Sequence, residues 1–348
     1  MKVCVCGYGV VGQGVVEILD RKDKDKVRYI FTRELLEDPR HVVDFMEVLK
    51  DPEVKIIVEA MGGLDPAFQM MENALKHEKH VVTSNKELVE KYGSYLNALA
   101  KKMGVHFMFE ASVGGGIPLI STLRHGLGYE DISQIKGILN GTSNYILTNM
   151  IQDGISFEVA LKDAMDKGYA EKDPTDDIEG YDTARKIAIL GSILLGKEID
   201  FKDIDIKGIV DINEDMITYA QNNKLKIKLI ASVEDTGKDV FISVAPTLID
   251  QTHPFYSIDG VDNAVLFKGQ DVGEVMVKGA GAGRYPTASA MVSDVYALDY
   301  KMPSTVFWTD EKVDVKYKDD NVLEFKNSKY EKKHKSEVDS KYYLSLGG

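Results

Sequence analysis

Short apolar runs alternate with longer amphipathic stretches along the first third of the chain. The apolar runs predict strands at Lys2–Cys6, Val27–Thr32, Ile56–Ala60, Val81–Thr83 and Val105–Phe109. The amphipathic stretches predict helices at Gly14–Leu19, Val42–Lys50, Pro66–Lys76 and Lys86–Lys102. Because strands and helices alternate, we expect an α/β fold with a doubly wound parallel sheet.

A glycine-rich turn joins the first predicted strand to the first predicted helix. Its sequence is Gly7-Tyr8-Gly9-Val10-Val11-Gly12. Such glycines permit a tight turn and a close approach of the backbone to a pyrophosphate, which the N-terminus of the following helix attracts. At this position the pattern predicts a Rossmann-type dinucleotide site, and a turn that binds no ligand is the alternative.

The end of the second predicted strand indicates which dinucleotide is preferred. Its sequence is Phe31-Thr32-Arg33-Glu34. An acidic residue at this place holds the ribose hydroxyls of NAD, whereas an arginine pairs with the 2′-phosphate of NADP. Arg33, together with Arg40, therefore favours NADP(H), and Glu34 keeps NAD(H) usable.

Composition places this chain of 348 residues among globular proteins with room for two domains. Its formal net charge of −13 argues against nucleic acid or an anionic membrane as a partner. It has no apolar run long enough for a membrane span, and its strand-like start leaves no room for a signal peptide. Cys4 and Cys6 lie in one strand, which favours small buried side chains over a zinc site. These properties fit a cytoplasmic enzyme or binding protein.

A strongly acidic segment occupies the middle of the chain. Six of the twelve positions from Glu171 to Asp182 are carboxylates, and Lys186 follows Asp182 by four residues. If a helix starts near Glu179 or Gly180, this spacing places Asp182 and Lys186 on one face. The apolar run after Lys186 suggests a buried helix. A solvated loop followed by a surface salt bridge is the simpler alternative.

Three further clusters of glycine or polar residues each allow two interpretations. The triple glycine within residues 110–118 suggests carbonyls turned towards a ligand or cation, or a plain domain hinge. The polar residues from Asn140 to Asn144 follow a predicted strand at Gln134–Leu139, and they suit either a helix cap or a substrate contact. The glycines of residues 279–283 precede a predicted helix at Thr287–Ala297. They suit either a return to the cofactor or tight helix packing.

Taken together and in this order, these blocks resemble the homoserine dehydrogenase family. Its signature is filled by Ala164, Gly168, Tyr169, Ala170, Asp173, Pro174, Asp177, Gly180, Asp182 and Lys186. The family's other blocks are GYGVVG at 7–12, EAMGG at 59–63, TSNKELV at 83–89, EASVGGGIP at 110–118, NGTSNYIL at 140–147 and GAGAGRYPTASAMVSD at 279–294. The similarity covers roughly residues 1–300.

The resemblance implies a reversible, NAD(P)H-dependent reduction of L-aspartate 4-semialdehyde to L-homoserine, a step of threonine and methionine biosynthesis. It implies Lys186 as the acid/base, oriented by Asp182, with Lys86 sharing or assisting the proton transfer. Carboxylates in the acidic segment suit the substrate's ammonium group. The substrate-binding residues implied are Glu171, Asp177, Tyr169 and Thr142. A non-catalytic NADP-binding sensor with the same fold remains the alternative.

The resemblance also implies a cofactor site, a cation site and a partner. The cofactor residues implied beyond the glycine-rich turn and Arg33 are Met61, Gly62, Ser84, Lys86 and Gly283. A sodium ion is implied on the backbone carbonyls of Glu110, Val113, Gly115 and Ile117, since a hard cation prefers oxygen ligands. The apolar elements between Ile132 and Ile209 favour a homodimer.

For the domains, we expect a Rossmann domain at residues 1–112, with residues 287–303 packing back onto it. An α+β catalytic and dimerisation domain should cover residues 113–286. Residues 304–348 form a charged tail, in which Ser340–Leu346 resembles the first strand of the regulatory ACT domain found in many bacterial relatives. A lone strand buries no core, so we expect the tail to be poorly packed or held by a neighbouring subunit.

Overall fold

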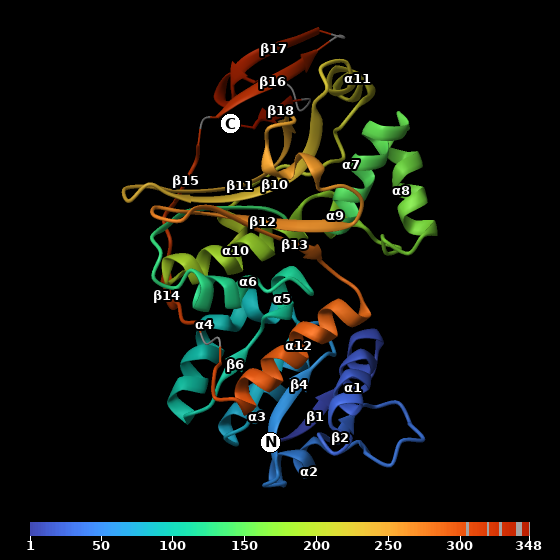
Figure 1. Cartoon of the computed structure of the whole chain (residues 1–348), viewed down its shortest axis with the longest axis vertical. Helices are drawn as coiled ribbons and strands as arrows, with labels where there is room; N and C mark the ends of the chain where they lie inside the picture. The colour runs from blue at the N-terminus through green and yellow to red at the C-terminus, as the bar shows by residue number, and fades with distance from the viewer. Residues whose placement is uncertain (304–305, 319, 327–328, 339–342, 348) are drawn as a thin grey trace. The chain divides into compact units, whose positions relative to one another are not determined.

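The computed structural model describes residues 1–303, 306–318, 320–326, 329–338 and 343–347 (Figure 1). The chain forms two compact units. The first comprises residues 1–129, 189–199 and 280–312, and the second comprises residues 130–188, 200–279 and those from 313 onwards. Residues 113–129 therefore belong to the first unit and not, as expected, to the second. No helix in the described part of the chain is long and apolar enough to cross a membrane.

The first unit contains a six-stranded parallel sheet in the order β3-β2-β1-β4-β5-β6. Its strands are β1 (Lys2–Cys6), β2 (Val27–Phe31), β3 (His41–Val42), β4 (Val54–Glu59), β5 (His80–Thr83) and β6 (Phe107–Met108). The connecting helices are α1 (Val10–Lys22), α2 (Phe45–Lys50), α3 (Ala67–Lys76) and α4 (Lys86–Met103). The order reverses between β1 and β4, where Rossmann folds bind dinucleotides. The predicted α/β class is confirmed.

The remaining elements of the first unit return to this core. They are α5 (Ala111–Gly114), α6 (Leu119–Ser121), a π-turn (Thr122–Gly126), β8 (Lys197–Glu198), α12 (Arg284–Asp299) and β14 (Thr309–Lys312). Figure 1 shows α12 lying beside α1, and both contribute buried residues to one cluster. A Cβ on Gly14 would lie 3.0 Å from the Cβ of Ala288, so this glycine permits the close packing.

One predicted helix begins later than expected. Val42 pairs with Phe31 in the short strand β3, and the helix starts only at Phe45. The carboxylate of Asp44 accepts a hydrogen bond from the Met46 N–H at 2.9 Å and thereby caps the helix. The cap residue, and not the apolar pattern, sets the boundary.

The second unit is built on a ten-stranded mixed sheet. The main order is β13-β12-β7-β10-β11-β18-β16-β17, and β9 and β15 also pair with β11. The strands are β7 (Ile132–Ile138), β9 (Asp205–Ile206), β10 (Lys226–Asp235), β11 (Val240–Ile249), β12 (Asp262–Gly269), β13 (Gly273–Ala280), β15 (Val315–Lys316), β16 (Asn321–Lys326), β17 (Lys329–His334) and β18 (Tyr343–Leu346). The helices are α7 (Gly141–Asp153), α8 (Phe157–Asp166), α9 (Thr175–Ile178), α11 (Glu214–Asn222) and α10 (Tyr181–Leu195), which continues into the first unit.

The expectation of a poorly packed tail is wrong for the described residues. Strand β18 pairs with β11 in parallel and with β16 in antiparallel orientation, so the tail extends the unit's own sheet. Val322, Phe325 and Leu344 are buried. A strand that would be unstable alone is stabilised here by partners elsewhere in the chain. Residues 340–342 of the ACT-like segment lie outside the described residues.

Candidate active site

Asp182 and Lys186 form a buried ion pair at the start of α10. Their side chains face each other across one helical turn, with Lys186 Nζ 2.9 Å from Asp182 Oδ2. The side chains are only 11% and 3% exposed, respectively. Lys186 Nζ also donates to the backbone oxygen of Leu139 at 2.8 Å. The alternative of a surface salt bridge is therefore wrong, because both charges are withdrawn from solvent.

Asn140 joins this pair to a second carboxylate. Its side-chain Nδ2 donates to Asp177 Oδ1 at 2.6 Å and to Asp182 Oδ2 at 2.9 Å. Its Oδ1 accepts from the Ser143 N–H at 2.8 Å and caps α7. The predicted cap is confirmed. The contact with both carboxylates was not expected from the sequence, because they follow Asn140 by 37 and 42 residues.

Asp177 carries a half-buried carboxyl group on the short helix α9. Burial raises its pKa, and the neighbouring charge of Asp182 raises it further. The Asn140 hydrogen bond and the Lys186 charge act in the opposite direction. The cluster therefore holds two carboxylates against one lysine in a partly desolvated site. Such an arrangement favours an incoming cation.

The other predicted substrate residues surround this cluster less closely. Thr142 Oγ1 donates to the Tyr169 backbone oxygen at 2.7 Å and ties the signature loop to α7. The Tyr169 ring is 45% exposed and packs on Tyr145, with ring centroids 4.8 Å apart. Glu171 lies exposed on the same loop. The structure thus brings Asp177 and Thr142 to the ion pair and leaves Glu171 at the surface.

The glycine-rich turn of the first unit fits a phosphate. Gly7 has a φ of +92°, and a Cβ on Gly12 would lie 2.0 Å from the Gly7 backbone oxygen. A Cβ on Gly9 would meet nothing within 4 Å, so that side of the turn is open. Gly9 is the N-cap residue of α1, and no side chain forms a capping hydrogen bond there. The first N–H groups of this helix are thus suited to a bound anion.

Glu59 organises the loop that follows β4. Its Oε1 accepts hydrogen bonds from the N–H groups of Met61 at 2.7 Å and Gly62 at 3.1 Å. Thr83 donates its hydroxyl to Oε2. Glu59 is fully buried and was not among the predicted site residues. The signal for it is an acidic residue that ends an otherwise apolar strand.

Asn85 holds the next loop. Its Nδ2 donates to the Gly63 backbone oxygen at 2.6 Å, and its Oδ1 accepts from the Leu88 N–H at 3.1 Å. It thereby caps α4, whose first residue is Lys86, and fixes the loop that contains Ser84. Lys86 belongs to the first unit and Lys186 to the second.

The two arginines near the end of β2 differ in their surroundings. Arg40 is held by Asp20 at 2.7 Å and by Asp38 at 2.8 Å. It is therefore already neutralised and is a poor second partner for a 2′-phosphate. Arg33 lies exposed directly after the strand. Gly283 precedes α12 with a φ of +115°, a backbone conformation that favours glycine.

Two buried carboxyl groups, those of Glu110 and of Asp294 on α12, lie close together at the start of the loop from Glu110 to Ile117. Glu110 accepts from the N–H groups of Ile120 and Ser121 at 2.8 Å each, and its own N–H donates to Asp294 Oδ2 at 3.0 Å. Burial raises the pKa of Glu110, and burial beside Glu110 raises that of Asp294 well above its usual value. Gly115 has a φ of +56°. Within the described residues, no group of three His, Cys, Asp or Glu side chains could hold a metal.

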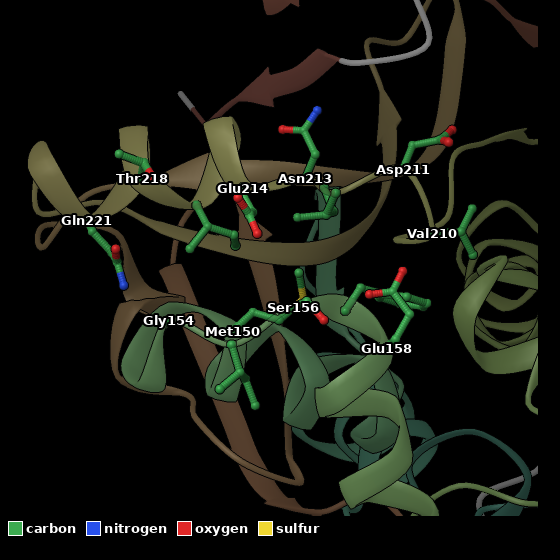
Figure 2. A pocket seen from close by; sticks show the side chains of 14 residues that line it. Met150, Gly154, Ser156, Glu158, Val210, Asp211, Asn213, Glu214, Thr218 and Gln221 are labelled. Atoms are coloured by element: carbon green, nitrogen blue, oxygen red, sulfur yellow. The ribbon is translucent and has the colours of Figure 1, made fainter. Parts of the chain in front are cut away.

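A pocket of about 570 Å³ in the second unit lies apart from these residues (Figure 2). Helices α7, α8 and α11 contribute to its lining. It includes the acidic residues Glu158, Asp211 and Glu214 but none of the predicted catalytic or substrate residues. The size of this pocket therefore does not identify the chemical site.

Comparison with known proteins matches both parts of the chain. Residues 7–110 match the family described as "Homoserine dehydrogenase, NAD binding domain", and residues 118–296 match "Homoserine dehydrogenase". The homoserine dehydrogenase of Bacillus subtilis (strain 168) is 40% identical over 314 residues, which cover 86% of this chain and 72% of that protein. The Synechocystis enzyme is 41% identical, with 85% and 72% coverage.

Solved structures give the same relationship. The homoserine dehydrogenase from Thiobacillus denitrificans superimposes with a TM-score of 0.85 at 36% identity, covering 94% of this chain and 83% of that one. A hyperthermophilic archaeal homoserine dehydrogenase in complex with NADPH superimposes with a TM-score of 0.74 at 27% identity, covering 87% of this chain and 98% of that one.

Proposed function

The chain belongs to the homoserine dehydrogenase family, and from this premise we propose that Lys186 is the acid/base of its reaction, oriented by Asp182. The activity is the NAD(P)-dependent interconversion of L-aspartate 4-semialdehyde and L-homoserine, in amino-acid biosynthesis. The observation that carries the assignment is the buried pair itself, with Nζ and Oδ2 2.9 Å apart.

The bound dinucleotide would supply a hydride to the aldehyde carbon. The aldehyde oxygen then becomes an alkoxide and requires a proton. An ammonium group has three N–H donors, and Lys186 uses two of them on Asp182 and Leu139. The third donor suits the substrate oxygen. In the reverse direction Lys186 accepts the proton of the homoserine hydroxyl, and Asp182 stabilises the resulting ammonium.

The substrate's ammonium group is assigned to the carboxylates. Asp177 is preferred because it is half-buried beside a second negative charge, so that a bound cation relieves repulsion. Glu171 on the exposed loop would complete the site when the substrate binds. Thr142 and Tyr169 would position the substrate, and Lys86 would assist the proton transfer from the first unit.

The first unit binds an NAD(P) cofactor, and we assign the preference to NADP(H). Gly7, Tyr8, Gly9, Val10, Val11 and Gly12 would hold the pyrophosphate, and Met61, Gly62, Ser84 and Gly283 would lie near the rest of the cofactor. The exposed Arg33 supports the preference, since its guanidinium can pair with a 2′-phosphate. NAD(H) remains usable through Glu34.

A sodium ion on the carbonyls of Glu110, Val113, Gly115 and Ile117 is supported by local charge. The carboxyls of Glu110 and Asp294 share one buried region, and each has a raised pKa. A hard monovalent cation beside them would offset this repulsion, and it would need no cluster of side-chain ligands.

A homodimer is supported by the edge of the second sheet. Strand β13 stands at one end of the sheet's order, with Met276 exposed on it and Val272 exposed in the turn just before it. An eight-residue edge strand with exposed apolar side chains is a surface that proteins usually cover. Pairing with a second copy of this chain would do so.

The direct test is the oxidation of NADPH by the purified protein with L-aspartate 4-semialdehyde, repeated with NADH. Turnover faster with NADPH is the expected result. Tight NADPH binding without any turnover would instead support the non-catalytic sensor.

A further inference from the structure

We propose that Asn140 is a positioning residue that keeps Asp177 and Asp182 together as a charged pair, one for the substrate's ammonium group and one for Lys186. Neither its place before α7 nor its sequence neighbours require this role. An N-cap uses only the side-chain oxygen, which here accepts from the Ser143 N–H. The amide nitrogen is left over, and it is the nitrogen that reaches the carboxylates.

The geometry uses both N–H groups of this amide. A side-chain amide nitrogen has two N–H donors, and those of Asn140 go to Asp177 and Asp182. Asn140 is 5% exposed, so water is a poor substitute for either bond. Both acceptors are carboxylates in surroundings where unsatisfied charge is costly. The amide therefore acts as a neutral spacer with two donors between like charges.

The oxygen of Asp182 that accepts from Asn140 is the one that accepts from Lys186. Nδ2 of Asn140 and Nζ of Lys186 both lie 2.9 Å from Asp182 Oδ2. Asn140 thus fixes the carboxylate that orients the proposed acid/base. The preceding residue, Leu139, presents its backbone oxygen to the same Nζ. Two successive residues at the end of β7 therefore determine where the ammonium group of Lys186 points.

The same contact affects the charge state of Asp177. Asp182 and Lys186 face this carboxyl from α10, and Asn140 and Thr142 face it from α7. Burial and Asp182 favour the protonated form, whereas Asn140 and Lys186 favour the charged form. Removing the amide donors should therefore raise the pKa of Asp177. The free enzyme would then lose its carboxylate for the substrate's ammonium at a higher pH.

The test is Asn140→Asp, because Asp caps a helix as well as Asn does but offers no amide donors and adds a negative charge. Asn213→Asp is the matched control, since Asn213 caps α11 through the same oxygen, accepting from the Met216 N–H at 3.1 Å. Asn140→Ser serves as a neutral variant that also keeps a cap. Melting temperature, NADPH affinity and the pH profile of kcat/KM are measured for all three.

For Asn140→Asp we expect a fall in kcat/KM at neutral pH of about 10- to 100-fold, as for lost hydrogen bonds to charged groups. The acidic limb of the profile should move upward by about one pH unit or more. Asn140→Ser should move it in the same direction but less. Asn213→Asp should match the wild type, and NADPH affinity should be unchanged throughout.

An acidic limb that stays in place in Asn140→Asp, whether activity is kept or lost equally at every pH, would overturn the proposal. The inference rests on the proposed roles of Lys186 and Asp177. Those roles are tested separately, because normal turnover in Lys186→Arg refutes the acid/base assignment whatever the Asn140 variants show.

Discussion

Two substitutions at Lys186 can distinguish the contribution of its charge to stability from its proposed role in proton transfer. Lys186→Ala removes the cation from a pair whose carboxylate is 3% exposed. Breaking a buried pair from one side costs roughly 3–5 kcal/mol, and the remaining Asn140 hydrogen bond to Asp182 places the cost near the lower value. A loss of about 3 kcal/mol corresponds to a fall in Tm of roughly 6 °C or more. We expect kcat to fall by about 10²- to 10⁴-fold, as for a missing general acid/base.

Lys186→Arg keeps a positive charge beside Asp182 but cannot release a proton near neutral pH. We therefore expect most of the stability to return while kcat stays as low as in Lys186→Ala. Lys162→Ala is the matched control, because Lys162 and Asp166 form the same i,i+4 pair at 2.6 Å with side chains 76% and 64% exposed. It should leave both stability and turnover almost unchanged, because an exposed ion pair is screened by solvent.

Thermal unfolding and steady-state kinetics, with NADPH binding measured by fluorescence, check all three variants. NADPH affinity should survive in each, since the dinucleotide turn belongs to the other unit. Near-normal kcat in Lys186→Arg would refute the acid/base role. Equal destabilisation by Lys186→Ala and Lys162→Ala would instead show that burial of the Asp182–Lys186 pair contributes nothing to the free energy of unfolding.

Four further predictions test other parts of the molecule. Arg33→Asp should weaken the binding of NADP(H) and preserve or improve the binding of NAD(H). A wild-type protein that turns over faster with NADH than with NADPH would contradict the proposed preference. Exchanging Na⁺ for tetramethylammonium should lower Tm, and more so as the pH rises, because rising pH favours the charged forms of Glu110 and Asp294, whose pKa values are raised. The effect should be much smaller in Asp294→Asn. Light scattering at micromolar concentration should report a dimer. A monomer alone would refute the proposed pairing of two copies through β13. Phe325→Ala should cost about 3–5 kcal/mol if the tail belongs to the core, whereas Tyr129→Ala, at a fully exposed side chain, should cost almost nothing.

Local patterns predicted the first unit well, because each of its elements is specified by residues close to it in the chain. The glycine-rich turn illustrates this. Gly7 and Gly12 lie five residues apart, and their contact is what excludes a side chain at Gly12. The start of α2 shows the limit of the method. An apolar residue such as Val42 suits a strand or a helix, and only the Asp44 cap decides where the helix begins.

The prediction for the tail was wrong because its structure depends on residues far away in the chain. Its abundant charges suggested a linker, and its apolar residues occur only in short runs such as Val322-Leu323. The tail joins the sheet through β18, which pairs with β11 about a hundred residues earlier in the chain, and β16 pairs with β18 in turn. Composition describes a segment but not its partners. A short apolar segment such as that of β18 therefore becomes a strand only when a sheet edge elsewhere in the chain accepts it.

Glu59 and Asn140, whose positioning contacts were not predicted from the sequence, share one property. Each is a polar residue at or just after the end of a buried strand, β4 for Glu59 and β7 for Asn140. A buried polar side chain must find partners, so its presence there implies that loops converge on it. In one unit the partners are backbone N–H groups beside the cofactor turn, and in the other they are the two carboxylates. Spacing could place Asp182 and Lys186 on one helix face, but only the end of β7 could bury them together. The buried pair of Asp182 and Lys186 is therefore a product of the tertiary fold, and a substitution at Asn140 should disturb it without changing either of its members.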